Sequence, residues 1–432
     1  MITSVIGIVF LFLLIMLGLP IAFALFVIGF AGMWYLKGFA VANSVVHLAP
    51  LGGILSGEVS TLPLFILIGA FALSAGVATD GYRAARIWLG RLPGGLGIAT
   101  IAASAAFAAC SGSSIAGAVT MGKLAIPEMK ANRYSDSLSA GVCGAGGLLA
   151  SMIPPSGMMV LYGLATNESI GRMLIAGIIP GILVSLFFVA GIVVTAKLNP
   201  NAAPLVKETF SWKQRFSVIP QIWGIILIFG TIFIGIFTGF FTANESAAWG
   251  ALIALVLLAI KARKDFVKKF VDACVESATI TVSLFFLILG AYVFSKFLIL
   301  AGLPQTISQT LIGSHMPSFV IMLGMIATFF ILGMFLDGVT IMLLTIPIYY
   351  PVVLELGYSG LWFGVIVVAM IEIGLLSPPF GLVAYAINAI APEIDLVQTF
   401  KGSLMFVLLE LAVVILLLVF PQIALWLPSL MK

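Results

Sequence analysis

Two parts of the chain carry the same apolar motifs in the same order. The matching pairs are FILIGA at 65–70 with FLILGA at 286–291, AVTMGKLAIP at 118–127 with GVTIMLLTIP at 338–347, and Pro-Pro pairs at 154–155 and 378–379. The partners lie 221, 220 and 224 residues apart, respectively. Paired interruptions of apolar segments in two repeats are typical of secondary transporters, whose binding sites lie where the repeats meet.

The composition requires a membrane. Hydrophobic residues make up 62% of the 432 positions and charged residues 8%, far less charge than a soluble surface of this size needs. Many stretches reach the ~20 apolar residues that cross a hydrocarbon core. The N-terminus lacks the basic region of a cleaved signal peptide, so the first apolar stretch is expected to stay. No basic patch is interleaved with aromatic residues, which argues against a nucleic-acid partner.

The basic residues predict that the two repeats cross the membrane in opposite directions. Three arginines, Arg83, Arg86 and Arg91, follow the segment 62–79, whereas five basic residues between 261 and 269 precede its partner, 276–300. Lys and Arg concentrate on the cytoplasmic side. The stretch after the partner, 301–317, contains neither residue type and is expected to be an outer loop. The repeats are therefore predicted to be inverted.

We expect an all-α polytopic membrane protein built from two inverted repeats. Residues 1–197 form the first repeat, 198–217 a cytoplasmic linker and 218–432 the second repeat. The predicted parts are scaffold helices over 1–79 and 218–300, re-entrant helical hairpins over 94–130 and 318–352, helices broken by Pro-Pro over 137–168 and 361–391, and closing spans over 172–197 and 398–420.

Four predicted interruptions define a candidate site: the hairpin tips at 110–114 and 336–340, and the breaks at 153–157 and 377–381. Backbone without helical hydrogen bonds is tolerated at membrane depth only where protein buries it or where it lines a cavity. Free carbonyl oxygens at a half-helix C-terminus suit Na⁺, and free N–H groups at a half-helix N-terminus suit a carboxylate. We therefore expect each tip to face the break of its own repeat across a Na⁺ site, with an anion between the tips.

Several residues have two readings. Asp337 is either a Na⁺ ligand or only the cap of the second hairpin arm. Glu372 and Glu410 lie in apolar spans and are either proton carriers or structural partners inside the protein. The glycines at 144, 146 and 147 are read as helix-packing contacts rather than ligands.

With these elements placed, the chain resembles the large membrane subunit of the tripartite ATP-independent periplasmic (TRAP) transporters over nearly its whole length. The resemblance rests on SGSSIAGAVTMGKLAIPEM at 111–129, GGLLASMIPPSG at 146–157, MLIAGIIPGIL at 173–183, FLDGVTIMLLTIPIYYPV at 335–352 and LLSPPFGLVAY at 375–385. It implies an elevator-type ion transporter in the bacterial cytoplasmic (inner) membrane, coupled to two or more Na⁺ ions. It also implies a separate small four-helix membrane subunit and a periplasmic binding protein that delivers an organic anion.

The motifs and the resemblance together predict three sets of residues. Na⁺ site 1 comprises Ser111, Gly112, Ser113, Ser114, Pro155 and Gly157; Na⁺ site 2 comprises Asp337, Gly338, Thr340, Pro378 and Gly381; the substrate site comprises Ser113, Ser114, Ser156, Thr340, Pro379 and Phe380. The motif alignment places Gly117 opposite Asp337. Because glycine has no carboxylate, the two cation sites are not expected to be equivalent.

The leading hypothesis is Na⁺-coupled uptake of a small carboxylate or sulfonate, such as a dicarboxylate or a sialic acid, by a three-component system. The alternative is a stand-alone Na⁺/dicarboxylate symporter of related architecture. An enzyme is not expected, because the spans contain no His/Asp metal pair, Ser–Lys dyad or Asp–Asp pair at helical spacing. A passive channel fits poorly with hairpins that stop halfway across the membrane.

Overall fold

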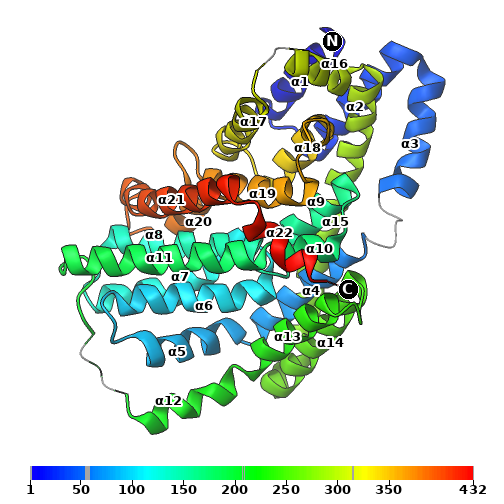
Figure 1. Cartoon of the computed structure of the whole chain (residues 1–432). Helices are drawn as coiled ribbons and strands as arrows, with labels where there is room; N and C mark the ends of the chain where they lie inside the picture. Colours follow the sequence, from blue (N-terminus) through cyan, green and yellow to red (C-terminus); the bar gives the residue numbers. More distant parts are fainter. Residues whose placement is uncertain (1, 54–58, 207, 209, 314–315, 432) are drawn as a thin grey trace.

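The structure is a computed structural model that describes residues 2–53, 59–206, 208, 210–313 and 316–431. All regular secondary structure within these ranges is helical (Figure 1). In the first half of the chain the helices are α1 (Ile2–Met16), α2 (Ile21–Lys37), α3 (Phe39–Gly53), α4 (Thr61–Ser74), α5 (Val77–Leu89), α6 (Gly95–Ser111), α7 (Ser114–Ala131), α8 (Asp136–Met152), α9 (Gly157–Thr166), α10 (Ile170–Ala176) and α11 (Ile178–Leu198).

The second half is helical as well. Its helices are α12 (Trp212–Val218), α13 (Trp223–Phe237), α14 (Ala243–Ala262), α15 (Phe266–Leu300), α16 (Leu303–Gly313), α17 (Ser318–Gly333), α18 (Gly338–Glu355), α19 (Gly360–Leu376), α20 (Leu382–Ile390), α21 (Leu396–Val419) and α22 (Gln422–Ser429), with 3₁₀ turns at Ile219–Gln221 and Arg263–Asp265.

Local sequence explains where the hairpins and broken helices turn. Helix α6 ends at Gly112, whose φ of 60° favours a residue without a Cβ. Helices α8 and α19 each end just before a Pro-Pro pair, because proline lacks the N–H donor and its ring clashes with the preceding turn. After the first pair, the side chain of Ser156 caps α9 by accepting a hydrogen bond from the Met159 N–H at 3.2 Å.

Three regions differ from the sequence-based expectation. The predicted span 62–79 bends by 63° after Ser74, where Gly76 adopts a φ of 76° and the amphipathic α5 begins. Its partner is longer than expected, since α15 runs over 35 residues and includes part of the basic cluster. The expected loop 301–317 contains α16, and the linker 198–217 contains most of α12. Absence of basic residues marks orientation rather than lack of helix, which explains the error at α16.

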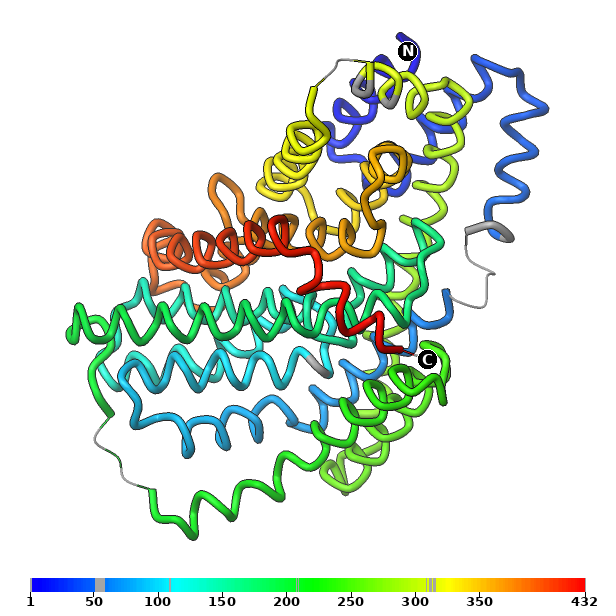
Figure 2. The backbone as a smooth tube through the Cα atoms, in the orientation of Figure 1, coloured from blue at the N-terminus to red at the C-terminus, as the bar shows by residue number. Residues whose placement is uncertain are grey.

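Small residues let the helices of the interior approach closely. Helices α6, α7, α8, α11 and α21 lie alongside one another (Figure 2). At the crossing of α8 with α21, a Cβ added to Gly402 would overlap the carbonyl oxygen of Ser137, and Gly141 lies directly against Gly402. Where α2 crosses α15, a Cβ on Gly29 would lie 2.7 Å from the Phe294 nitrogen. Close helix approach through small residues is a standard source of packing energy in membrane proteins.

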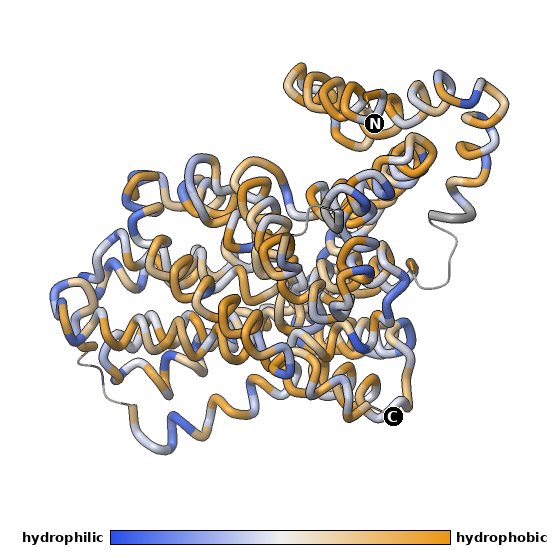
Figure 3. Tube along the Cα trace, turned by 45° about the horizontal axis from the view of Figure 1, so that its top comes forward, coloured by the Kyte–Doolittle hydropathy of each residue, from blue (hydrophilic) through white to orange (hydrophobic). Residues whose placement is uncertain are grey.

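The outer surface is apolar along the helices. Hydrophobic residues predominate along the helices, and hydrophilic residues gather mainly near helix ends and connections (Figure 3). Large exposed apolar side chains include Leu186, Ile234, Leu252 and Ile415. Five helical segments of the described chain are long and apolar enough to cross a membrane, or up to seven if each of two bent helix pairs is one span. Such a surface is stable only in contact with lipid.

Gly402→Val is expected to destabilise the protein, because a β-branched side chain would force α8 away from α21. Overpacking of this kind costs about 1–3 kcal/mol. We expect a lower melting temperature and a smaller monodisperse peak in size-exclusion chromatography of the detergent-solubilised protein. Gly230→Val is the matched control, since nothing lies within 4 Å of a Cβ there. Equal behaviour of the two variants would contradict the close crossing of α8 and α21.

Candidate functional site

Both hairpin tips border one internal cavity of about 320 Å³. The first tip contributes residues 111–114, and the second contributes residues 337–339. Helices α4 and α15 supply much of the remaining wall, and the first broken helix supplies Ser151, Gly157 and Met158. The tips lie about half the chain apart in sequence, so the fold creates a shared site that neither half contains alone.

The first tip sits directly on the first Pro-Pro break. The Gly157 N–H donates a hydrogen bond to the carbonyl oxygen of Gly112 at 3.4 Å. A Cβ on Gly112 would lie 2.8 Å from the Pro155 carbonyl oxygen, so only glycine fits this contact. The Ser111 hydroxyl oxygen is buried and has no hydrogen-bond partner among the described residues. The Ser111 hydroxyl is thus a buried polar group still open to a ligand.

A chain of hydrogen bonds leads away from this tip into the protein. The Ser114 and Ser151 hydroxyl oxygens are 2.6 Å apart, and the Ser151 hydroxyl donates to Glu372 Oε1 at 2.5 Å. All three side chains are buried. Glu372 therefore has a hydrogen-bond partner inside the protein, as the structural interpretation expected, and this partner, Ser151, links it to Ser114 at the candidate site.

The second tip is built around Asp337. Its carboxylate caps α18 by accepting hydrogen bonds from the Thr340 N–H at 3.0 Å and from the Thr340 hydroxyl at 2.5 Å. The prediction that Asp337 caps the second hairpin arm is thus confirmed. Asp337 also lines the cavity, whereas Thr340 is buried behind it and does not.

Several residues of the predicted site lie away from the cavity in this structure. The second break packs beside the second tip through the rings of Phe335 and Phe380, whose centroids are 5.6 Å apart. The residues that do not line the cavity are Pro155, Ser156, Thr340, Pro378, Pro379, Phe380 and Gly381. Pro378, Pro379 and Phe380 are exposed, and the Ser156 hydroxyl donates inward to the Ser151 carbonyl at 2.5 Å. The two breaks therefore have different surroundings, although their sequences match.

The predicted pairing of Gly117 with Asp337 is wrong. Ser113 caps α7 and Asp337 caps α18, and these two residues are 224 residues apart, as are the first prolines of the two breaks, Pro154 and Pro378. The motif alignment used a spacing of 220, which is one helical turn out of register. Apolar helices resemble themselves when shifted by one turn, so sequence similarity alone did not fix the register. The two tips still differ, since one cap is a hydroxyl and the other a carboxylate.

The cavity is bordered by negatively charged side chains and by partial positive charges. Asp337 and Glu276 supply two carboxylates, and no Lys, Arg or His is among the lining residues. The N-termini of α7, α9 and α18 also reach the cavity, and each carries a partial positive charge. Within the described chain, no group of three or more His, Cys, Asp or Glu residues is placed to hold a metal ion.

Sequence reasoning missed three contributors. Ser151 lies three residues before the first Pro-Pro pair, and Glu276 lies at the start of the apolar partner segment, positions that could have drawn attention to both. Gly69 belongs to the first repeated motif, and a Cβ there would lie 3.0 Å from the Ser111 carbonyl oxygen. The small size of Gly69 thus lets α4 close the wall behind the first tip. The glycines at 144, 146 and 147 are packing contacts, as expected; a Cβ on Gly147 would lie 2.5 Å from the Ser114 carbonyl oxygen.

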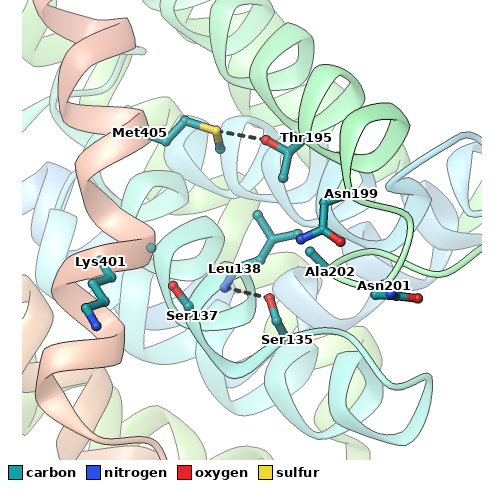
Figure 4. A pocket seen from close by; sticks show the side chains of 10 residues that line it. Ser135, Ser137, Leu138, Thr195, Asn199, Asn201, Ala202, Lys401 and Met405 are labelled. Atoms are coloured by element: carbon teal, nitrogen blue, oxygen red, sulfur yellow. Dashed lines mark hydrogen bonds between the residues drawn. The ribbon is translucent and has the colours of Figure 1, made fainter.

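A second cavity, of about 480 Å³, lies between α8, α11, α21 and the connection after α11 (Figure 4). Its lining is mixed, with polar residues that include Ser135, Ser137, Thr195, Asn199 and Lys401. It shares no lining residue with the cavity between the tips. The Thr195 hydroxyl is 3.1 Å from the sulfur of Met405 across this space.

The sequence profile of one family, described as "Tripartite ATP-independent periplasmic transporter, DctM component", matches residues 8–423. The chain belongs to this family. It is a multi-pass membrane protein and a large permease subunit of a TRAP transporter.

Individual relatives agree. The C4-dicarboxylate TRAP transporter large permease protein DctM of Pseudomonas aeruginosa is 32% identical over 368 residues, 85% of each chain. The ectoine/5-hydroxyectoine TRAP transporter large permease protein UehC of Ruegeria pomeroyi is 30% identical over 427 residues, 96% of each chain. The crystal structure of the Alcanivorax borkumensis YdaH transporter has the same fold, with a TM-score of 0.62 at 13% identity over 92% of this permease and 90% of that chain. These relatives are transporters rather than enzymes.

Gly112→Ala is expected to impair function more than folding. Alanine would pay about 1–2 kcal/mol for the left-handed backbone and would also push the tip off the Pro155 carbonyl. Gly76→Ala is the matched control, because Gly76 has the same left-handed backbone, with a φ of 76° and a ψ of 23°, and nothing lies within 4 Å of a Cβ there. We expect similar melting temperatures for the two variants and a loss of substrate uptake only for Gly112→Ala. Equal uptake would contradict a role for the tip contact.

Proposed function

We propose that this permease couples the entry of two or more Na⁺ ions to the uptake of a small organic anion. The observation that carries the proposal is the cavity between the hairpin tips. It combines two carboxylates, three helix N-termini and the unpartnered Ser111 hydroxyl, and its described lining residues include no basic side chain. Carboxylates and free carbonyls favour a cation, and helix N-termini favour an anion, so the cavity suits both together.

The first Na⁺ site is proposed at the first tip. Its ligands are drawn from the oxygen atoms of Ser111, Gly112, Ser113 and Ser114, opposite Pro155 and Gly157. Helix α6 ends at this tip, and the end of a helix leaves carbonyl oxygens available, as expected for a half-helix end that binds Na⁺. The unpartnered Ser111 hydroxyl and the glycine-only contact at Gly112 support the assignment.

The second Na⁺ site is proposed at Asp337 and Gly338. Thr340 acts through Asp337 there, because its N–H and hydroxyl both hold the carboxylate in place. The second site thus carries a negative charge that the first tip itself lacks. The roles first assigned to Pro378 and Gly381 find no support in the lining of the cavity.

This arrangement gives a physical reason for coupling. An anion that enters the cavity alone meets the negative charges of Asp337 and Glu276, which repel it. Bound Na⁺ removes that repulsion and leaves the N-termini of α7, α9 and α18 to attract the anion. Cation and anion therefore bind better together than apart, which is the requirement for symport.

The remaining features follow the family. We infer two inverted repeats in the bacterial inner membrane, with the hairpins and broken helices in a transport domain that moves as an elevator against a scaffold. A separate small membrane subunit and a periplasmic binding protein are expected partners. The substrate class is a carboxylate or sulfonate, which the C4-dicarboxylate relative supports, although the ectoine relative indicates that the family extends further.

Reconstitution into proteoliposomes tests the proposal. The permease, its small subunit and the loaded binding protein are combined with radiolabelled succinate as the first probe. Uptake is expected only with an inward Na⁺ gradient and not with K⁺. Uptake that does not depend on Na⁺ would contradict the proposal. Uptake by the permease alone, without the other two components, would instead favour a stand-alone Na⁺/dicarboxylate symporter.

Asp337→Asn is expected to weaken Na⁺ activation of uptake about tenfold, since it removes the charge while keeping the shape of the α18 cap. Expression and melting temperature without Na⁺ should change little. The Na⁺ concentration that gives half-maximal uptake is the measurement. Asp395→Asn, at the cap of α21 and away from the cavity, is the matched control. An unchanged Na⁺ titration would remove Asp337 from the site.

A further inference from the structure

The first hairpin tip has no carboxylate of its own, but one reaches it from the other half of the chain. Glu372 lies on α19 and accepts the Ser151 hydroxyl at 2.5 Å, and the Ser151 oxygen is 2.6 Å from that of Ser114 at the tip. The exposed fractions are 1% for Glu372 and Ser151 and 6% for Ser114. The chain of oxygens is therefore buried along its length and ends at the cavity, which Ser151 and Ser114 line.

The direction of these hydrogen bonds follows from counting protons. A hydroxyl has one hydrogen to donate, and Ser151 gives its hydrogen to Glu372. Ser151 must then accept in its contact with Ser114, so Ser114 donates toward Ser151 and away from the cavity. The free lone pairs of Ser114 remain for a ligand on the cavity side. A cation requires lone pairs rather than a hydrogen atom at that place.

We propose that Glu372 is a positioning residue for the first cation site, which through Ser151 holds the Ser114 hydroxyl with its lone pairs available to Na⁺. This inference rests on the proposed Na⁺ coupling. It makes a residue of the second half responsible for a site in the first half. Because linked hydrogen bonds polarise one another at low dielectric, the Ser114 oxygen also becomes a stronger acceptor.

A purely structural role explains the choice of glutamate poorly. Glu372 Oε2 is buried without a partner, and neither Glu372 nor the nearby buried Glu410 forms an ion pair within the described chain. An apolar side chain would fill the same space without burying an unpaired oxygen. Glu410 on α21 is also fully buried, but neither of its oxygens has a hydrogen-bond partner among the residues that the structure describes. It is therefore a matched residue that lacks the link to the tip.

The test uses the full-length permease in detergent, with NaCl replaced by choline chloride at constant ionic strength. The rise in melting temperature with Na⁺ gives the half-saturating concentration without any substrate. Glu372→Met and Ser151→Ala are each expected to raise that concentration about tenfold, the effect of one lost hydrogen bond. The double variant should be no weaker than either single variant, because both break the same chain. Glu410→Met should stay within about twofold of the wild type.

The conservative variant Glu372→Gln separates positioning from charge. Its amide oxygen can still accept from Ser151, so we expect Na⁺ binding between that of the wild type and that of Glu372→Met. If Glu372→Gln binds Na⁺ as weakly as Glu372→Met does, the positioning role is overturned in favour of a charge effect. Half-saturating Na⁺ concentrations equal to that of the wild type in Ser151→Ala and Glu372→Met would also overturn it. If Glu372→Met does not fold, the result for Ser151→Ala decides alone. A wild-type protein that Na⁺ does not stabilise would instead contradict the proposed Na⁺ coupling itself.

Discussion

The cost of leaving backbone hydrogen-bonding groups unpaired in hydrocarbon constrains everything else in this structure. The chain is helical throughout its described parts, yet it interrupts its helices at two hairpin tips and two Pro-Pro breaks. Such interruptions are stable only where other groups meet the freed N–H and carbonyl groups. At the first tip these are groups of the adjacent break, as the hydrogen bond between Gly157 and Gly112 shows. The candidate site thus lies where helices of the fold are interrupted.

The two halves of the chain stabilise each other at that place. Gly122 on α7 packs against Ile387 and Ile390 of α20, whereas Gly338 at the start of α18 packs against Met158 of α9. Each hairpin arm therefore rests on a half-helix of the other repeat. The hydrogen bond from Ser151 to Glu372 joins the halves in the same region. The contacts near the tips therefore come from both halves of the chain.

Similar sequence does not give equivalent contacts. Gly69 and Gly290 occupy the same position in the repeated motif, but Gly69 lies against the first tip and Gly290 lies against Ala22 of α2. The first tip is capped by Ser113 and the second by Asp337. The first break is buried, whereas Pro378, Pro379 and Phe380 of the second are exposed. In this structure the two candidate cation sites are therefore different in charge and in access.

The sequence by itself determined the membrane setting and the positions of the interruptions, because proline, glycine and hydrophobicity act locally. It also identified Ser111, Ser114 and Asp337, since polar residues at interruptions in apolar segments stand out. It did not determine the register of the two tips, because apolar helices look alike after a shift of one turn. The tertiary structure alone decided that Ser151, Glu276 and Glu372 belong to or support the site and that Phe380 lies outside the cavity. These assignments depend on contacts between helices distant in sequence, and such contacts leave no local signal in either partner.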